Sequence, residues 1–217
     1  MTGSMNLPDP EWRVTPGLTD YPAAVSAMET RVAGIRDGSA RELIWLVEHP
    51  PLYTAGTSAQ AGDLLDPDRL PVFQTGRGGQ YTYHGPGQRV GYVMLDLDAR
   101  GRDVRCFVDS LEHWLIDALG VLGITAYQAA GRVGIWTRTS AGEAKIGAIG
   151  VRVRRWVTFH GFALNISPDL GNFMGIIPCG LPTFPVTSLN ELDNYSTLAD
   201  ADAALGATFS SFLAALH

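Results

Sequence analysis

Lysine is almost absent from this chain of 217 residues. Fifteen of its 16 basic residues are arginine, and the sixteenth is Lys145. Arginine keeps its proton in proteins, whereas the pKa of a lysine falls readily when its surroundings disfavour the charge. The single lysine is therefore a candidate for a role that needs a titratable amine, and the alternative is that one lysine simply remains in an arginine-rich composition.

Cysteine is also scarce, and long apolar runs are missing. Cys106 and Cys179 are too few for a disulfide framework, which favours a reducing, cytoplasmic location. No apolar run reaches the roughly 18 residues that a membrane span needs, and the first residues lack the charged and apolar regions of a secretory signal. The net charge of −6 argues against a general nucleic-acid-binding protein. We therefore expect no membrane and no nucleic acid among the partners.

The hydrophobic content of 46% and the charged content of 18% permit a packed core. We see no repeat, low-complexity tract or linker, so residues 1–217 are expected to form one domain, with residues 1–10 as a loose tail. Hydrophobic periodicity predicts three helices, at 20–36, 103–122 and 198–216. It predicts strands at 12–14, 42–48, 90–97, 124–128, 133–137, 144–153 and 156–166, and irregular chain at 50–70 and 167–190. This pattern indicates an α+β fold, a single domain with a mixed β-sheet and packed helices.

The stretch Gly76 to Gln88, GRGGQYTYHGPGQ, holds five of the 25 glycines. Glycine lets a ligand approach the backbone closely, so a phosphate-binding loop is the first interpretation. The stretch lacks both common nucleotide motifs, GxxxxGK[ST] and GxGxxG. A strand is predicted to follow it, so no helix N-terminus is offered to a phosphate. A β-hairpin loop without function and a wall of a ligand site remain as the two readings.

Cys179 lies between Pro178 and Gly180, which suit a turn. A cysteine on a turn can be exposed and aimed, as a nucleophile requires. The alternative is a buried structural cysteine. Cys106 lies beside the apolar stripe of the second predicted helix, and we expect it to serve in packing.

His84 and His160 each precede a glycine on a predicted strand. Either side chain could orient or polarise a substrate carbonyl, or it could be a hydrogen-bonded core residue. Neither has a metal-ligand spacing to another histidine or cysteine, so we expect no metal site. Arginines at the predicted turn after residue 153 are either solvated surface or a docking site for an acidic protein partner: Arg152, Arg154 and Arg155.

Four motifs follow one another in the chain: RGGQYTYHGPGQ from Arg77, KIGAIG from Lys145, HGFALN from His160 and PCG from Pro178. In this order they resemble the lipoyl(octanoyl) transferases of protein lipoylation, over about residues 12 to 215. One position departs from the family pattern. Gly147 stands where the family more often has alanine or cysteine, which bears on the shape of the pocket wall.

The resemblance implies a fold similar to the biotin and lipoate protein ligases, and no cofactor. It implies transfer of an octanoyl or lipoyl group from acyl carrier protein to a lysine of lipoyl domains, in 2-oxoacid dehydrogenase complexes and in the glycine cleavage H protein. Cys179 would be the acyl-accepting nucleophile and Lys145 its partner. The acyl pocket would be lined by Arg77, Gly78, Gly79, Gln80, Tyr81, Thr82, Tyr83, His84, Ala148, Ile149, Gly150, Gly161, Phe162 and Ala163.

The implied chemistry is consistent with the residue types. A thiolate attacks a thioester carbonyl readily, and a nearby amine can take the proton of the thiol or stabilise the thiolate. Two other functions stay open. An ATP-dependent lipoate or biotin ligase of the same fold would not need Cys179, and a non-catalytic module would bind the acyl group or its carrier without transfer.

Overall fold

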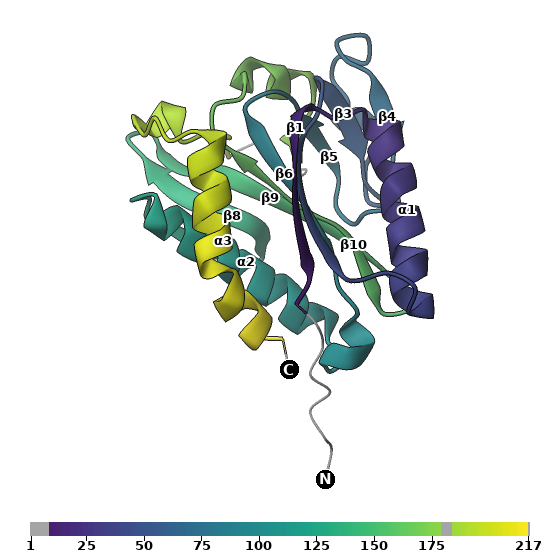
Figure 1. The fold of residues 1–217 in the computed structure, drawn as a ribbon. Helices are drawn as coiled ribbons and strands as arrows, with labels where there is room; N and C mark the ends of the chain where they lie inside the picture. Colours follow the sequence, from purple (N-terminus) through teal and green to yellow (C-terminus); the bar gives the residue numbers. More distant parts are fainter. Residues whose placement is uncertain (1–8, 179–183, 217) are drawn as a thin grey trace.

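Two β-sheets of unequal size form the centre of the molecule, in a computed structural model that describes residues 9–178 and 184–216. The large sheet has the strand order β1-β2-β6-β10-β9-β8-β7, and the small sheet has the order β4-β3-β5 (Figure 1). β1 and β2 are parallel, as are β3 and β4, and the other strand pairs are antiparallel, so both sheets are mixed. The strands are β1 Glu11–Leu18, β2 Leu43–Glu48, β3 Leu52–Ala55, β4 Val72–Gln74, β5 Tyr81–His84, β6 Gln88–Met94, β7 Ala126–Ala129, β8 Arg132–Thr139, β9 Gly142–Arg154 and β10 Val157–Asn165.

Three helices cover the large sheet. They are α1 Tyr21–Asp37, α2 Val104–Val121 and α3 Leu198–Ala214. Asp20 caps α1 by accepting from the amide of Ala23 at 3.0 Å, and Gly38 ends it with a left-handed φ of 78°. Helix α3 begins with a reciprocal capping box between Thr197 and Asp200. Local sequence signals therefore define the helix ends.

The two faces of the large sheet carry separate hydrophobic cores. α2 and α3 pack on one face and α1 packs on the other (Figure 1). Strand β10 serves both cores by alternation, because Phe162 and Leu164 contact the α2 and α3 side whereas Ala163 contacts the α1 side. Trp114 of α2 stacks on Phe212 of α3 with ring centroids 4.8 Å apart, which joins these helices to each other.

Most of the predicted elements are confirmed, and one prediction about the middle of the chain is wrong. Residues 50–70 are predicted to be irregular, but Leu52–Ala55 forms β3. Within the glycine-rich stretch, the predicted strand at His84 is confirmed as β5, Tyr81–His84, which pairs with β3. Both strands have four residues, and pairing between them outweighs their weak local signals. Short 3-10 helices interrupt the irregular segments at Ala61–Asp63, Leu97–Arg100, Leu170–Gly175 and Asn190–Leu192. Residues 1–8, most of the predicted tail, lie outside the described residues.

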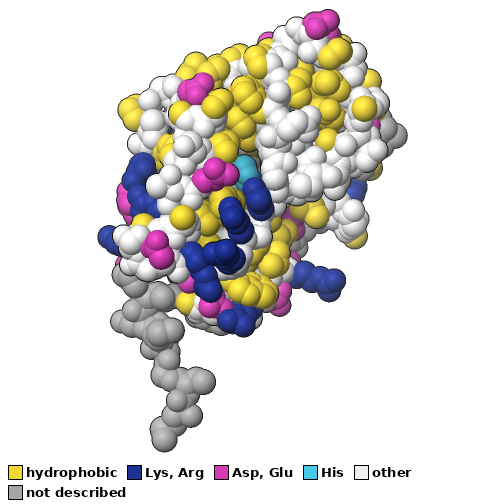
Figure 2. All heavy atoms as spheres, turned by 90° about the vertical axis from the view of Figure 1, so that its right-hand side faces the viewer, with side chains coloured by type: hydrophobic (Ala, Val, Ile, Leu, Met, Phe, Trp, Pro, Cys, Tyr) yellow, Lys and Arg dark blue, Asp and Glu magenta, His cyan; other side chains and the backbone are white. Residues whose placement is uncertain are grey.

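The surface is uneven in charge. On the side of the molecule where α1 lies, Lys and Arg side chains gather in one group next to a visible His side chain (Figure 2). Hydrophobic side chains spread over the upper part of the same face. Across residues 9–178 and 184–216, each helix is too short or too polar to cross a bilayer.

Candidate functional site

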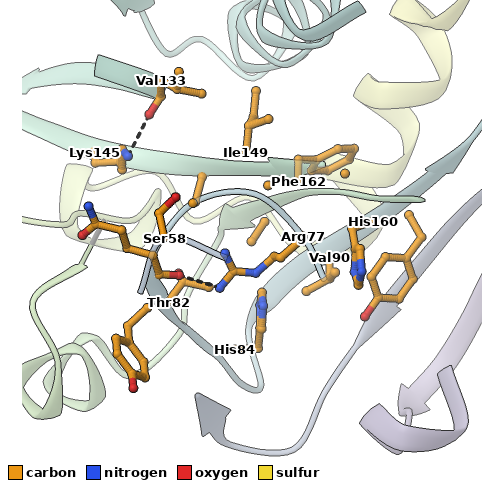
Figure 3. Close-up of a pocket in the computed structure, with 18 of the residues that line it drawn as sticks. Ser58, Arg77, Thr82, His84, Val90, Val133, Lys145, Ile149, His160 and Phe162 are labelled. Atoms are coloured by element: carbon orange, nitrogen blue, oxygen red, sulfur yellow. Dashed lines mark hydrogen bonds between the residues drawn. The ribbon is translucent and has the colours of Figure 1, made fainter. Parts of the chain in front are cut away.

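A cavity of about 290 Å³ lies between the small sheet and the strands β6, β9 and β10 (Figure 3). Its volume is at the lower end of the range for small-molecule sites. Backbone and side chains of both sheets line it: Tyr21, Ser58, Arg77, Gly79, Gln80, Tyr81, Thr82, His84, Val90, Tyr92, Gly131, Arg132, Val133, Lys145, Ala148, Ile149, Gly150, His160, Gly161, Phe162 and Ala163.

Small residues on β9 and β10 form one wall of this cavity. Ala148 pairs with Ala163, and Gly150 pairs with Gly161. A Cβ atom placed on Gly161 would lie 2.3 Å from the carbonyl oxygen of Gly91. Close approach of the strands thus excludes larger side chains there and leaves the wall narrow and mostly apolar.

Arg77 holds the loop of residues 76–80 against the small sheet. Its Nη2 atom donates to the carbonyl oxygens of Thr54 at 2.7 Å and Gln80 at 2.8 Å, and its Nη1 atom donates to Gly78 at 2.9 Å. The side chain is 7% exposed. Charged guanidinium donors on backbone carbonyls make strong, directional contacts, so Arg77 fixes the shape of the glycine-rich wall.

His84 is buried in a polar network behind β5. Its Nδ1 atom lies 2.7 Å from Oε1 of Gln88, and Nε2 of Gln88 donates to Oδ1 of Asn165 at 2.9 Å. Burial, together with the neighbouring His49, lowers the pKa of His84 to about 3. His84 is therefore neutral at physiological pH.

The end of the cavity near α1 is also uncharged. Burial lowers the pKa of His160 to about 4, with Arg77 and Arg152 acting in the same direction. His49 contacts the Tyr92 hydroxyl at 2.6 Å, and burial raises the pKa of Tyr21 to about 12. Neutral rings and hydroxyls at this end suit an uncharged ligand, and the fixed positive charges in the cavity lining belong to Arg77 and Arg132.

Lys145 lies at the other end of the cavity from His160 (Figure 3). Its Nζ atom donates to the carbonyl oxygen of Val133 at 2.9 Å and lies 5.2 Å from the ring centre of Trp136. β9 carries an irregularity here, because Ile135 pairs with Gly147 but Trp136 pairs with Lys145. The extra residue reverses the alternation of side chains, so Lys145 shares the cavity with Ala148.

Cys179 lies outside the described residues, but both chain segments that flank it reach Lys145. Pro178 lines a small cavity together with Lys145 and Thr82. On the other side, Val186 forms a parallel bridge with Lys145, and the amide of Lys145 donates to the carbonyl oxygen of Pro185 at 2.9 Å. The described residues on both sides of Cys179 therefore lie close to the single lysine.

The cavity contains most of the residues that the sequence predicted for an acyl pocket. Gly78 and Tyr83 are the two that do not line it. The amide of Gly78 donates a hydrogen bond to the carbonyl oxygen of Val151 at 2.9 Å, which connects the loop of residues 76–80 to β9. Tyr83 alternates with the cavity-facing His84 and packs its ring against Phe173, 5.2 Å between centres. Gly147 lines the small cavity beside Lys145, and Cys106 contacts Ala215 on α3.

Sequence reasoning missed several lining residues. Tyr21, Ser58, Val90, Tyr92 and Val133 come from four separate segments and carry no local signal for a site. His160 was a candidate for substrate contact, and it does line the cavity. Among the residues that the structure describes, no group of three histidine, cysteine or acidic side chains could hold a metal ion.

Comparison with known proteins is consistent with this site. The family model of the lipoyl protein ligase A/B catalytic domain matches residues 20–210. An octanoyltransferase of Rhizorhabdus wittichii is 65% identical over 209 residues, covering 96% of this chain and 94% of the relative. An octanoyltransferase of Sphingopyxis alaskensis is 62% identical over 209 residues, covering 96% of each chain.

Solved structures share the fold at low sequence identity. A bi-partite lipoate protein ligase from Thermoplasma acidophilum has a TM-score of 0.68 at 16% identity, over 94% of this chain and 84% of the other. A lipoate-protein ligase A bound with ATP has the same TM-score and identity, over 94% of this chain and 86% of the other. These likenesses confirm the predicted fold. The family model and the curated relatives together show that this chain belongs to the lipoyl protein ligase A/B catalytic domain family and, within it, to the octanoyltransferases.

Proposed function

We propose that this protein transfers an octanoyl group from acyl carrier protein to a lysine of a lipoyl domain, through a thioester on Cys179. The observation that carries the proposal is the convergence on Lys145. Pro178 and Val186, on the two sides of the segment with Cys179, both contact the surroundings of this lysine. Acyl transfer through a thioester requires a thiol nucleophile and a group that takes its proton, and we assign these roles to Cys179 and Lys145.

The first half-reaction moves the acyl group onto the enzyme. Lys145 takes the proton of the Cys179 thiol, and the thiolate attacks the carbonyl carbon of the octanoyl thioester. The bond between that carbon and the sulfur of the carrier breaks, and the carrier thiolate recovers the proton from the Lys145 ammonium. One thioester replaces another, so this step is close to balanced.

The second half-reaction delivers the acyl group to the acceptor. The amine of the target lysine attacks the carbonyl carbon of the Cys179 thioester, an amide bond forms, and the Cys179 thiolate leaves. Lys145 is the group in position to accept the proton that the amine loses. Acceptors with the required lysine are the lipoyl domains of 2-oxoacid dehydrogenase complexes and the glycine cleavage H protein.

The cavity supplies binding energy for the acyl chain. An octanoyl group has seven methylene or methyl carbons, and burial at about 0.8 kcal/mol each is worth roughly 5–6 kcal/mol before ordering costs. Ala148, Gly150 and Ala163 offer the chain a narrow apolar wall. His84 and His160 are neutral, so they add no charge to that of the arginines in the cavity lining.

The acyl carrier protein has a candidate docking site at the turn between β9 and β10. Arg154 and Arg155 are exposed there, and Arg152 lies two residues beyond the cavity residue Gly150. In the part of the chain that the structure describes, none of the three forms an ion pair. Uncompensated arginines beside a site attract an acidic partner and speed its association.

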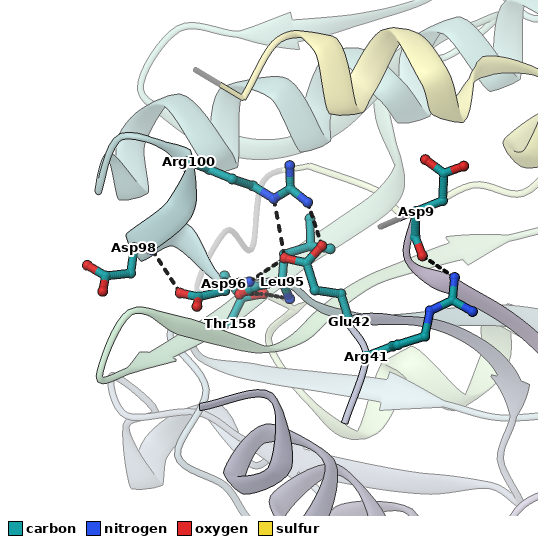
Figure 4. A network of polar contacts seen from close by, with 8 residues as sticks. All are labelled: Asp9, Arg41, Glu42, Leu95, Asp96, Asp98, Arg100 and Thr158. Carbon is teal, nitrogen blue, oxygen red and sulfur yellow. Dashed lines mark hydrogen bonds and ion pairs between the residues drawn. The ribbon is translucent and has the colours of Figure 1, made fainter. Parts of the chain in front are cut away.

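A polar network connects the turn end of this hairpin to the neighbouring chain (Figure 4). Thr158 of β10 donates to Val93 at 2.6 Å and accepts from the amide of Leu95 at 2.9 Å. Next to Leu95, the amide of Asp96 donates to Oε1 of Glu42 at 2.7 Å, and Nε of Arg100 donates to the same oxygen at 3.3 Å. The turn that carries the arginines is thus attached to the large sheet, which favours their role in docking.

Intact-mass measurement tests the proposal. Wild-type protein mixed with octanoyl acyl carrier protein should gain one octanoyl mass, and peptide mapping should place it on Cys179. Cys179→Ser should gain no thioester and transfer nothing to a lipoyl domain. An active protein with an unmodified Cys179 would overturn the mechanism. Ligation by Cys179→Ala that requires ATP and free octanoic acid would instead identify a ligase, and carrier binding without transfer would identify a binding module. A cytoplasmic location stays a prediction.

A further inference from the structure

A buried carboxylate lies behind Lys145, outside the cavity. Glu112 projects from α2 and is only 8% exposed. Its Oε1 atom accepts from the amide of Gly134 at 2.7 Å, and its Oε2 atom accepts from Nε2 of Gln128 at 2.9 Å. In the described part of the chain it forms no ion pair with an arginine or lysine. Removing a carboxylate from water is costly, so its place here needs a reason.

Glu112 and Lys145 form hydrogen bonds with the two ends of one peptide group, the one that joins Val133 to Gly134. The amide nitrogen of Gly134 donates to Glu112, and the carbonyl oxygen of Val133 accepts from Nζ of Lys145. The N–H and C=O of one trans peptide point in opposite directions. Glu112, the peptide group and Lys145 therefore form one hydrogen-bonded series. The bonds of such a series strengthen one another.

The strand is irregular where this peptide lies. The pairing of β8 with β7 shifts its register beyond Gln128, and Gly134 has a φ of 120°. A Cβ atom on Gly134 would lie 2.8 Å from Cε of Lys145. The irregularity thus turns the Val133 carbonyl toward the lysine, and glycine leaves room for the lysine stem.

We propose that Glu112 is a positioning residue that holds the Val133–Gly134 peptide and, through it, fixes the place of Lys145. This inference rests on the proposed function only in giving Lys145 a role in acyl transfer. Loss of the carboxylate should free the peptide and release the Lys145 amine from its hydrogen bond to Val133, which leaves the amine more accessible to a reagent but badly placed for acyl transfer.

The composition of the chain makes a direct test possible. Lys145 is the single lysine, so modification by an amine reagent at one pH, followed by peptide mass mapping, reports on this side chain with the N-terminal amine as internal reference. Glu112→Ala should raise the labelling rate of Lys145 by about threefold or more. It should also lower the rate of Cys179 acylation by about tenfold or more, because displaced catalytic groups react slowly. Glu112→Gln keeps an oxygen for Gly134 and should change both rates less.

A matched control and a second variant complete the test. Gln128→Ala removes the bond to Oε2 of Glu112 and leaves the bond to Gly134, so labelling should stay at the wild-type rate. If Glu112→Ala does not fold, Glu112→Asp decides the matter, because its shorter side chain withdraws the carboxylate from the amide of Gly134 and leaves the surroundings of Lys145 unchanged. Labelling of Lys145 at the wild-type rate in the folded variant would overturn the inference. Altered labelling in a protein whose wild type never forms a Cys179 adduct would overturn the proposed function alone.

Discussion

The Nδ1 atom of His84 lies 2.7 Å from Oε1 of Gln88, and this contact sets the tautomer of a histidine in the cavity wall. The side-chain nitrogen of Gln88, Nε2, donates to the carbonyl oxygen of Tyr83 and to Oδ1 of Asn165. Gln88 therefore presents its oxygen to His84, whose Nδ1 must carry the proton. The neutral ring then offers Nε2 as an acceptor toward the hydroxyl of Thr54 at 3.4 Å.

This buried neutral state has a consequence for acid stability. The pKa of His84 falls to about 3 and that of His160 to about 4, below the ordinary value of 6.5. Above pH 6.5 both states of the protein hold these rings neutral. Below it the unfolded chain takes up protons that the folded protein refuses, so the free energy of unfolding should fall by about 1.4 kcal/mol per pH unit for each histidine. Urea unfolding at pH 6.5, 5.5 and 5.0 measures the slope.

His160→Asn isolates one of these contributions. Asparagine tolerates the left-handed backbone at this position, where φ is 58°, and it does not titrate. The slope of stability against pH should be shallower than that of the wild type by about 1.4 kcal/mol per pH unit below pH 6. Equal slopes in the two proteins would show that His160 titrates normally in the folded state.

Lys145→Arg should separate charge from proton transfer. The guanidinium keeps a positive charge but does not act as a base, and its larger head must fit beside Gly134. We expect octanoyl transfer to fall by about 100-fold or more, as is typical for the loss of a general base. The rate of amide formation on a lipoyl domain is the measurement, with thermal unfolding as the check on folding. Transfer within about threefold of the wild type would exclude Lys145 as a required base.

Gly56→Ala should displace the loop of residues 76–80, which forms the glycine-rich wall of the cavity. A Cβ atom on Gly56 would lie 2.2 Å from the carbonyl oxygen of Gly79, so the loop that Arg77 holds must shift. Overpacking of this kind costs about 1–3 kcal/mol, and acyl transfer should slow with it. Gly62→Ala is the matched control, because a Cβ there has no atom within 4 Å. Urea unfolding and transfer assays on both variants make the comparison, and equal behaviour of the two would contradict a close contact at Gly56.

Arg154→Gln combined with Arg155→Gln should weaken the binding of octanoyl acyl carrier protein. We expect KM for octanoyl acyl carrier protein to rise by about tenfold at low salt, while transfer from a small octanoyl thioester stays unchanged. The difference should shrink as ionic strength rises, because salt screens exposed charges. Arg138→Gln is the control, because Arg138 lies on β8 opposite Glu143, near the end of β9 that is remote from this turn. An equal loss with the small thioester would place the effect in the cavity rather than in docking.

Local sequence patterns predicted the helices and much of the large sheet. The stripe of apolar residues on α2 and the capping residues Asp20 and Asp103 predicted helices because their physics is local. The strand Leu52–Ala55 was missed because four residues have little periodicity. Its partner strand, Tyr81–His84, lies 26 to 32 residues away along the chain, from the pair Ala55 and Tyr81 to the pair Leu52 and His84.

The sequence by itself determined the family, because the long glycine-rich motif and the three motifs that follow it are visible without a fold, and it nominated a single lysine and a cysteine as the reacting groups. Only the tertiary structure decided which of these residues meet. It turned Tyr83 away from the cavity, since a strand sends neighbouring side chains to opposite faces. It brought Tyr21, Tyr92 and Val133 to the cavity from distant segments. It also placed Glu112 behind Lys145 through a single peptide group, a relation that depends on a register shift between strands and has no signature in the linear chain.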